Sequence, residues 1–312
     1  MVGFRRSLSF STPSPRRPTL AEKSYHVRSI SLPCKSHPLL SQLKDKIDDL
    51  RRWESELNAA TTTTTTTTGV STSACLCDGL THLKNLQHCL DDLLHLPQTQ
   101  ESLRRRSDWV ENLLEDFLRF VDVYGIFRIA LLALKEQQLT AQVAIRRRDE
   151  SKMVSYVKAC NRKDKDMRKL ASVVRCIGKW SAPAMSSDSD AELAAILRDV
   201  TQVTVSVSVA LFNGISSSSS SSAPGSWMMT GWRLSRKTQK IKKQKGIREF
   251  EEAEVQSLQL LRKKGDEEVM RMTLRRLQAL DDCIGGIESG TEKVFRSLIN
   301  TRVSLLNVLT QY

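Results

Sequence analysis

The sequence predicts an all-α fold, an elongated multi-helix bundle with long antiparallel helices, a disordered N-terminal arm and low-complexity loops. Leu, Arg, Lys, Glu and Gln, which are good helix formers, dominate the 312 residues. Aromatic residues make up only 5% and glycines number 13, which disfavours a barrel or a sandwich that needs regular turns. Apolar residues recur at three- and four-residue steps, the period of an amphipathic helix. We therefore expect an arm at 1–37 and a helical domain at 38–312, interrupted by loops at 61–73 and 216–226 and by a basic segment at 228–248.

The N-terminal arm is rich in Ser, Arg and Pro and carries seven basic residues against one acid, Glu22. This composition predicts disorder. Chloroplast transit peptides share the same profile, so import is an alternative to a cytoplasmic location. Within the arm, Arg28, Ser29, Ser31 and Pro33 fit the pattern bound by phosphoserine-binding adaptors of the 14-3-3 type. A phosphate on Ser31 would supply the charge that such an adaptor binds. A chance match in a Ser/Arg-rich tail is the alternative.

Two amphipathic helices follow the arm. The first begins at Pro38, which suits the first turn of a helix, and ends near Asn58. Eight threonines at 61–68 then start a low-complexity loop. The second helix covers roughly Ala74 to Leu96, and Pro97 ends it. The expected inward residues of the two helices are Leu39, Leu43, Ile47, Leu50, Trp53 and Leu57, and then Leu76, Leu80, Leu83, Leu86, Leu90 and Leu93.

The most apolar stretch is a central helix over 109–145, reached through a short turn at 98–106. Ser107 with Asp108 is expected to cap its start, and Gly125 is the one expected break. Its inward stripe is Trp109, Leu113, Phe117, Phe120 or Val121, Tyr124, Phe127, Leu131, Leu134, Gln138 and Ala141 or Gln142. A helix this apolar needs neighbours that cover it.

The next helix follows the Arg146–Arg148 run and is closed by Gly178 and Pro183. Its inward residues are Met153, Tyr156, Cys160, Met167, Leu170, Val174 and Ile177. A further helix starts near Ala191 with Ser187, Asp188 or Asp190 as its cap. There the valines at 203–209 alternate with Ser and Thr as an exposed strand would. An isolated strand has no partner in a helical chain, so helix is the expected state.

Seven serines at 216–222 begin a flexible linker, and the basic segment follows it. A long helix is expected from Glu249 to Ile287, with Gly265 as a weak point. The glycines at 285, 286 and 290 then predict a turn, and Thr291 to Leu309 the last helix. No transmembrane segment is expected, because the longest uncharged run, 200–232, is too polar.

The net charge of +13 is concentrated in two appendages. The arm carries +6 and residues 228–248 carry +8, so the helical body is nearly neutral. Basic residues beside tryptophans can contact an anionic membrane, and the same charges suit nucleic acid, nuclear import or a solvated surface. The candidate contact residues are Trp232, Arg233, Arg236, Lys237, Lys240, Lys242, Lys243 and Lys245.

No catalytic, cofactor or metal motif stands out. The seven cysteines are irregularly spaced and are interpreted as reduced thiols in an intracellular protein. Cysteines and histidines cluster between Cys75 and His95, but the C-x-C pair lacks the spacing of structural zinc sites. Gly285–Gly290 lacks the lysine of a phosphate-binding loop. We expect a non-enzymatic protein without a cofactor.

Several blocks carry a family resemblance. They are Tyr25–Pro33 (YHVRSISLP), Ser36–Leu39 (SHPL), Leu83–Leu86 (LKNL), Cys89–Pro97 (CLDDLLHLP), Arg146–Asp149 (RRRD) and Thr301–Asn307 (TRVSLLN). In this order they resemble the plant family of domain of unknown function 241, the BYPASS-like proteins. The resemblance implies a helical plant protein without known enzymatic activity, associated with root and shoot development. The Thr and Ser tracts look like additions particular to this chain.

Together these observations predict a helical scaffold that acts through protein partners or an anionic membrane surface. A nucleic-acid-associated or nuclear regulator is the alternative. The expected location is cytoplasmic or peripheral to a membrane, with chloroplast or nucleus as alternatives.

Overall fold

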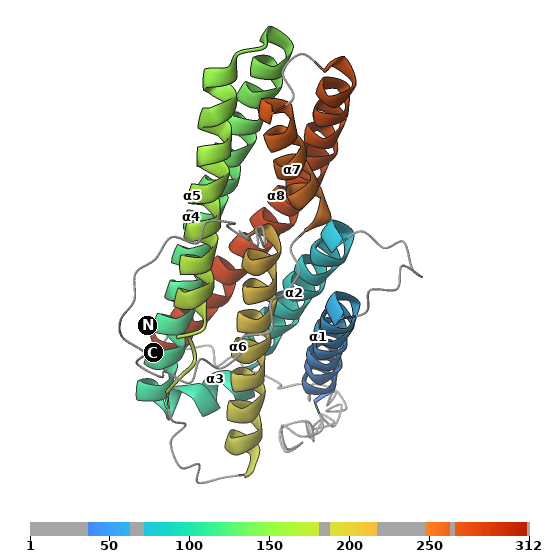
Figure 1. Cartoon of the computed structure of the whole chain (residues 1–312). Coiled ribbons are helices and arrows are strands. Elements are labelled where there is room, and N and C mark those ends of the chain that lie inside the picture. The colour runs from blue at the N-terminus through green and yellow to red at the C-terminus, as the bar shows by residue number, and fades with distance from the viewer. Residues whose placement is uncertain (1–36, 63–71, 181–187, 217–246, 263–265, 311–312) are drawn as a thin grey trace, which may run out of the picture. The chain divides into compact units, whose positions relative to one another are not determined.

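The computed structural model describes residues 37–62, 72–180, 188–216, 247–262 and 266–310. In these ranges the chain forms helices and no strand, so the predicted all-α class is confirmed (Figure 1). The helices are α1 (Pro38–Thr62), α2 (Thr72–Leu94), α3 (Pro97–Arg104), α4 (Ser107–Arg147), α5 (Glu150–Val174), α6 (Asp188–Ile215), α7 (Arg248–Arg262) and α8 (Glu267–Thr310). The described residues belong to one packing unit.

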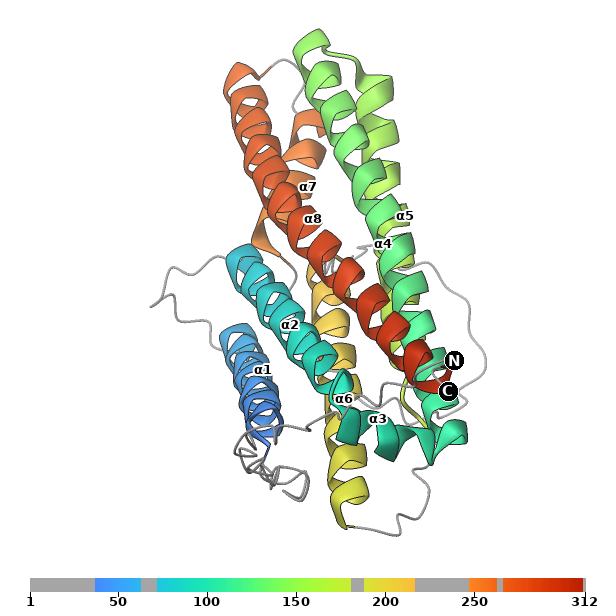
Figure 2. The same cartoon turned by 180° about the vertical axis from the view of Figure 1, so that it is seen from behind.

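Helix α8 lies between α2 and α4 in one layer, and α6 lies behind this layer and contacts α1, α2 and α5 (Figures 1 and 2). The two longest helices, α4 and α8, run antiparallel. Lys135 of α4 pairs with Glu288 of α8 at 3.0 Å, and Arg128, two turns earlier in α4, pairs with Glu292, one turn later in α8. Along the same seam Gln138 donates from Nε2 to the carbonyl of Leu277.

The predicted break of the central helix at Gly125 is wrong, because α4 is continuous from Ser107 to Arg147. A glycine inside a helix costs about 1 kcal/mol relative to alanine, which the burial of one large apolar side chain offsets. The predicted inward stripe is confirmed, with Phe120 and Ala141 as the buried choices. The expected Ser107 cap is not formed, since the N-cap residue is Arg106 and no side chain caps it.

The predicted turn at Gly285–Gly290 is also wrong, because α8 passes through all three glycines. Two of them allow α2 to approach closely. A Cβ at Gly290 would lie 2.9 Å from Leu80 Cδ1, and one at Gly286 would lie 3.2 Å from Cys77 Sγ. These glycines are packing positions, and the real interruption separates α7 from α8 between 262 and 267.

A third difference concerns residues 98–106, where a turn was expected. Pro97 ends α2 and also starts α3, with Leu96 as the N-cap residue. Proline suits the first helical position because its missing N–H would have no partner there. Leu103 and Thr99 of this short helix are buried.

Helix α6 confirms the helical interpretation of 203–209 and is the core of the second layer. Phe212 is fully buried and lies 4.9 Å from Phe127, measured between ring centroids. The span Asp190–Ile215 is long and apolar enough to cross a membrane, but 67% of its most apolar window is buried inside the bundle. A core helix has this composition, because other helices surround it.

Buried polar groups connect the helices through the core. Gln87 of α2 donates from Nε2 to Thr204 Oγ1 of α6 at 3.0 Å, and Thr301 of α8 reaches Gln87 Oε1 at 3.4 Å. Tyr124 of α4 bonds Ser208 Oγ at 3.0 Å. Because the Ser208 hydroxyl donates to the Thr204 carbonyl, Tyr124 is the donor in that pair.

The end of α5 is fixed to α4 by a buried carboxylate. Asp116 accepts a hydrogen bond from the amide of Gly178 at 3.2 Å and another from Trp180 Nε1 at 2.6 Å. Gly178 has a φ of 74°, a left-handed conformation that glycine adopts without strain. The Trp180 ring then packs edge-on against Trp109 at 6.2 Å.

Candidate functional site: the anchor of the basic segment

The described chain stops at Ser216, after α6, and resumes at Ile247, just before α7. The amide of Ile247 donates to the carbonyl of Gly214 at 2.7 Å. This bond brings together two points that are 33 positions apart in the chain. The contact therefore holds together the described residues on either side of 217–246.

Side-chain packing around this hydrogen bond holds Ile247 against Gly214. Ile247 is fully buried. A Cβ at Gly214 would lie 2.7 Å from Leu76 Cδ1 and 3.5 Å from Ile247 Cγ1. Only a residue without a side chain lets α6, α2 and Ile247 meet at this distance.

The acidic start of α7 is paired with the bundle. Glu249 accepts a hydrogen bond from Ser73 of α2 at 2.9 Å. Glu252 pairs with Arg248 at 2.5 Å and with Arg276 of α8. Both carboxylates, which follow the basic segment in the chain, are therefore paired with described residues.

The predicted contact residues of the segment, from Trp232 to Lys245, lie outside the described residues, and so do Arg28, Ser29, Ser31 and Pro33 of the arm. Both sets remain predictions. The anchor itself was not found from the sequence. Its only signal was Gly214 near the end of an otherwise apolar helix.

The cysteines and histidines between Cys75 and His95 do not converge. His88 lies 3.3 Å from Asp92, and His95 Nδ1 lies 2.7 Å from the Asp91 carbonyl. Within the part of the chain that the structure describes, no three His, Cys, Asp or Glu residues are grouped as metal ligands.

Burial makes the core thiols weaker acids. It raises the pKa of Cys283 to about 12, helped by the nearby Glu249 carboxylate. Burial also raises the pKa of Cys75, Cys77 and Cys89. A reactive cysteine needs the opposite shift, because the thiolate is the nucleophile.

A buried ionisable cluster joins α5 to α7. Lys163 Nζ lies 3.2 Å from Asp164 Oδ1 and 4.4 Å from the centroid of the Phe250 ring. Burial raises the pKa of Tyr156 well above its usual value, and the pKa of Cys160 is raised for the same reason. One signal of this cluster was overlooked in the sequence, because Lys163 occupies an inward position between Cys160 and Met167.

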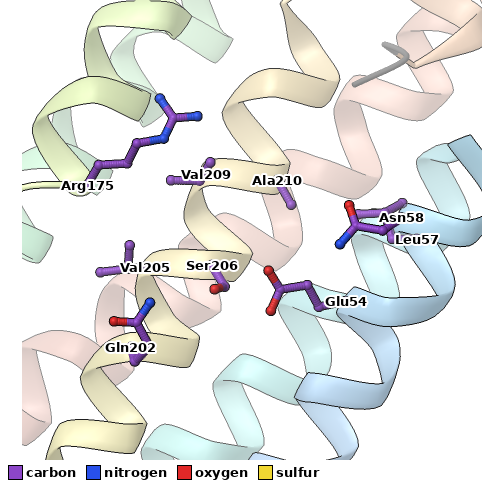
Figure 3. Close-up of a pocket in the computed structure, with 9 residues that line it drawn as sticks. All are labelled: Glu54, Leu57, Asn58, Arg175, Gln202, Val205, Ser206, Val209 and Ala210. Carbon is purple, nitrogen blue, oxygen red and sulfur yellow. The ribbon is translucent and has the colours of Figure 1, made fainter. Parts of the chain in front are cut away.

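Two surface cavities lie at helix junctions. The first, of about 220 Å³, lies between α1, α6 and the end of α5. In Figure 3, Glu54 extends from α1 toward α6, and Arg175 approaches α6 from the opposite side. This volume is below the roughly 300–1,000 Å³ of small-molecule sites. The second, of about 390 Å³, lies between α4 and α5, and Glu136, Lys152 and Arg162 are among the residues that line it. Ser206 and Glu54 line the first cavity and Ser155 and Glu136 the second, but no hydrogen bond joins serine to carboxylate among these described residues, and Ser155 Oγ donates to the Ser151 carbonyl at 3.0 Å.

Comparison with known families gives one match, to the family described as Protein BPS1, over residues 79–308. The match covers well over half of the chain. The chain belongs to this family. The BPS1 family is the plant-specific family of domain of unknown function 241, so the resemblance inferred from the sequence is confirmed. BPS1 membership suggests a plant protein related to development. No curated protein and no solved structure matches the chain.

The BPS1 match runs from Gly79 to Val308, so it begins inside α2 and ends near the end of α8. It includes Gly214, Ile247 and the whole basic segment 228–248. The contact between Gly214 and Ile247 and the basic segment therefore lie within the region that the family match covers.

Proposed function

We propose that this BPS1-family chain is a non-enzymatic helical scaffold that uses its basic segment to contact an anionic membrane surface. Protein partners then assemble on the bundle during plant organ development. The anchor between Ile247 and Gly214 is the observation that carries the proposal. The bond joins the two described positions that flank the basic residues 233–245, so we expect contacts made by these residues to position the whole bundle.

The positive charge of the basic segment is large enough for measurable binding to an anionic membrane. Each basic residue near an anionic leaflet contributes about 1 kcal/mol, so even half of the basic residues at 228–248 would give measurable binding. Tryptophan side chains prefer the headgroup level of a bilayer, which suits Trp232. The described helical body adds no comparable excess of positive charge.

The chemistry of the bundle also favours contact over catalysis. The core thiols have raised pKa values, and Lys163 and Asp164 neutralise each other. Buried charges that are paired in this way are typical of structural positions.

Co-sedimentation with phosphatidylserine-containing vesicles tests the proposal. The test variant carries glutamate at Lys240, Lys242, Lys243 and Lys245. The control variant carries glutamate at four exposed basic residues outside the loop, Lys158, Lys165, Arg168 and Lys179, and so has the same net charge. We expect the test variant to lose vesicle binding and the control to keep most of it. Equal loss in both would reduce the effect to net charge alone and refute a dedicated loop.

Nucleic-acid binding is the second candidate, because the same charges can contact phosphates. Competition decides between the two. Adding RNA or duplex DNA to the vesicle assay at equal phosphate concentration should leave the membrane-bound fraction nearly unchanged. Displacement of the chain into a salt-sensitive complex with the nucleic acid would instead support a nuclear or RNA-associated role.

We expect the N-terminal arm to bind protein partners independently of the basic segment, through its phosphoserine motif. We expect affinity capture of the full chain to recover a phosphoserine-binding adaptor, and Ser31→Ala to abolish its recovery. An unchanged set of partners would refute the adaptor. Imaging the tagged chain with and without residues 1–35 tests the location, and plastid import that needs the arm would refute a cytoplasmic or peripheral-membrane site.

A further inference from the structure

A short basic corner joins α3 to α4. Arg104 is the last residue of α3, and Ser107 is the first residue of α4. Arg105 and Arg106 form the turn between them, so the corner reads Arg-Arg-Arg-Ser. Protein kinases select substrates by charge pattern, and the basophilic class reads arginines two and three positions before the serine that it phosphorylates. Arg105 and Arg104 occupy those two positions relative to Ser107.

The side chain of Ser107 is accessible to an enzyme. The residue is exposed, and its Oγ makes one hydrogen bond among the described residues, to Asp108 Oδ1 at 3.5 Å. This distance is well beyond the roughly 2.8 Å of a good hydroxyl donor. Exposed serines inside helices, such as Ser55 and Ser155, instead donate to the carbonyl four residues earlier at 3.0 Å. The hydroxyl of Ser107 is therefore weakly held and free to react.

A kinase binds its substrate segment in an extended form, so the corner has to open locally. Buried side chains stand on both sides of the segment, Leu103 before it and Trp109 after it. Arg105 and Arg106 already lie outside both helices. Opening therefore involves the end of α3 and the first two residues of α4, and helix ends open at a small fraction of the global unfolding free energy.

We propose that Ser107 is a phosphorylation site for a basophilic serine/threonine kinase that uses MgATP. In this reaction Ser107 Oγ attacks the γ-phosphorus of ATP, and its proton passes to the catalytic base of the kinase. The bond between the β- and γ-phosphoryl groups breaks, so the products are phosphoserine and ADP. The inference does not rest on the proposed membrane function.

The product phosphate lies at a helix start that has no cap. The N-cap residue of α4 is Arg106, and no side chain caps the helix. The amides of Ser107 and Asp108 have no hydrogen-bond partner among the described residues. A phosphate on the first helical residue supplies acceptor oxygens for these amides and places negative charge at the positive end of the helix dipole. Phosphorylation is therefore expected to fasten the first turn of α4.

Two arginines of the corner differ in how readily they can turn to the phosphate. Arg105 pairs with Glu101 at 3.0 Å, and both side chains are more than half exposed. A surface pair of this kind contributes little, so Arg105 can exchange it for a stronger pair with phosphate. Arg104 donates from Nε to the carbonyl of Val308 at 3.1 Å. We expect it to stay there, because α8 has no basic residue in its own last turn.

Incubation of the full chain with MgATP and the catalytic subunit of cyclic-AMP-dependent protein kinase, an enzyme of this class, tests the site. Mass spectrometry of the digested chain should find phosphate on Ser107. Ser151 is the internal control, since it is also exposed at the start of a helix but has an arginine only three positions before it and acids in between. It should stay unmodified. Arg105→Gln should lower the initial rate at Ser107 by about tenfold, whereas Arg106→Gln, at a position that the kinase does not read, should leave it unchanged.

Hydrogen exchange tests the effect on the helix. Amides at 109–112 should exchange about two- to fivefold more slowly in the phosphorylated chain, because the phosphate stabilises the first turn of α4. Ser107→Ala, treated with the same kinase, controls for phosphate on serines of the N-terminal arm and should show no such slowing.

Four results would overturn the proposal. They are a Ser107 that stays unmodified in the folded chain, equal phosphorylation of Ser151, a rate that Arg105→Gln does not change, and exchange at 109–112 that is not slowed by the phosphate.

Discussion

The amide of Ile247 and the carbonyl of Gly214 are hydrogen-bonded at 2.7 Å, which fastens the start of α7 to the end of α6. This contact joins the two described positions that flank the basic residues 233–245. The missing side chain of Gly214 is what allows it, since Leu76 fills the space where a Cβ would be.

Glycine substitutions should therefore have opposite effects at two helical positions. Gly214→Val should lower the free energy of unfolding by about 1–3 kcal/mol, because its side chain collides with Leu76 and Ile247. Gly285→Ala should raise it by about 0.5–1 kcal/mol, since a Cβ there meets no atom within 4 Å and alanine favours the helix. Urea unfolding followed by circular dichroism measures both. Equal destabilisation by the two changes would contradict the close approach at Gly214.

The Gln87–Thr204 hydrogen bond should be measurable as a coupling energy. A double-mutant cycle with Gln87→Met and Thr204→Val should give about 1 kcal/mol of coupling, because each single change leaves a buried polar partner without its bond. Chemical denaturation of the four proteins supplies the numbers. A second cycle between Gln87 and the exposed Asp45 of α1 is the control and should give no coupling.

Replacing the buried carboxylate that fixes the end of α5 should also be costly. Asp116→Asn should lower the free energy of unfolding by about 1–3 kcal/mol, because an amide has one acceptor oxygen for the two donors at Gly178 and Trp180. Asp122→Asn, at an exposed position on the same helix, should change it by less than about 0.5 kcal/mol. The indole N–H resonance of Trp180 should shift only in the first variant, and an unshifted resonance would remove the bond from the account.

Cys283 should make the bundle less stable in alkali. Its pKa is about 12 in the folded chain, against 9.0 for an ordinary thiol. Above pH 9 the unfolded thiol loses its proton while the folded one keeps it, so the unfolded state is favoured as the pH rises toward 12. The slope from one such group is up to about 1.4 kcal/mol per pH unit. Cys283→Ala should show a shallower fall in unfolding free energy between pH 9 and pH 10 than the wild type. Parallel curves would contradict the burial of this thiol.

The helical stripes were predictable from the sequence because burial and period coincide. Leu80, Leu83, Leu86 and Leu90 repeat at three and four residues, and all are buried. The state of 203–209 could be inferred by the same reasoning. Its valines alternate, but an extended segment would have had no strand to pair with.

The helix boundaries were less predictable, because glycine and proline have more than one role. Gly286 and Gly290 were interpreted as a turn, whereas they admit the side chains of α2 into α8. Pro97 was interpreted as a stop, whereas it also starts α3. The choice between these roles depends on a neighbouring helix, which local sequence does not contain.

The anchor at Gly214 and Ile247 could not be predicted for the same reason, since it joins positions separated by the whole basic segment. The apolar residues of α4 are spread around the helix in the sequence, but which of them face a neighbour depends on where α5 and α8 lie. The candidate residues of the arm and of the basic segment remain predictions from composition and motif.

We propose that the basic segment brings the bundle to an anionic membrane surface. The most direct test of this proposal is the partition coefficient of the full chain onto vesicles of increasing phosphatidylserine content, measured at several salt concentrations. We predict partitioning that rises steeply with anionic lipid, falls with salt, and is nearly abolished by glutamate at Lys240, Lys242, Lys243 and Lys245. Partitioning that is equal on zwitterionic and anionic vesicles, or that is unaffected by those four changes, would contradict the account.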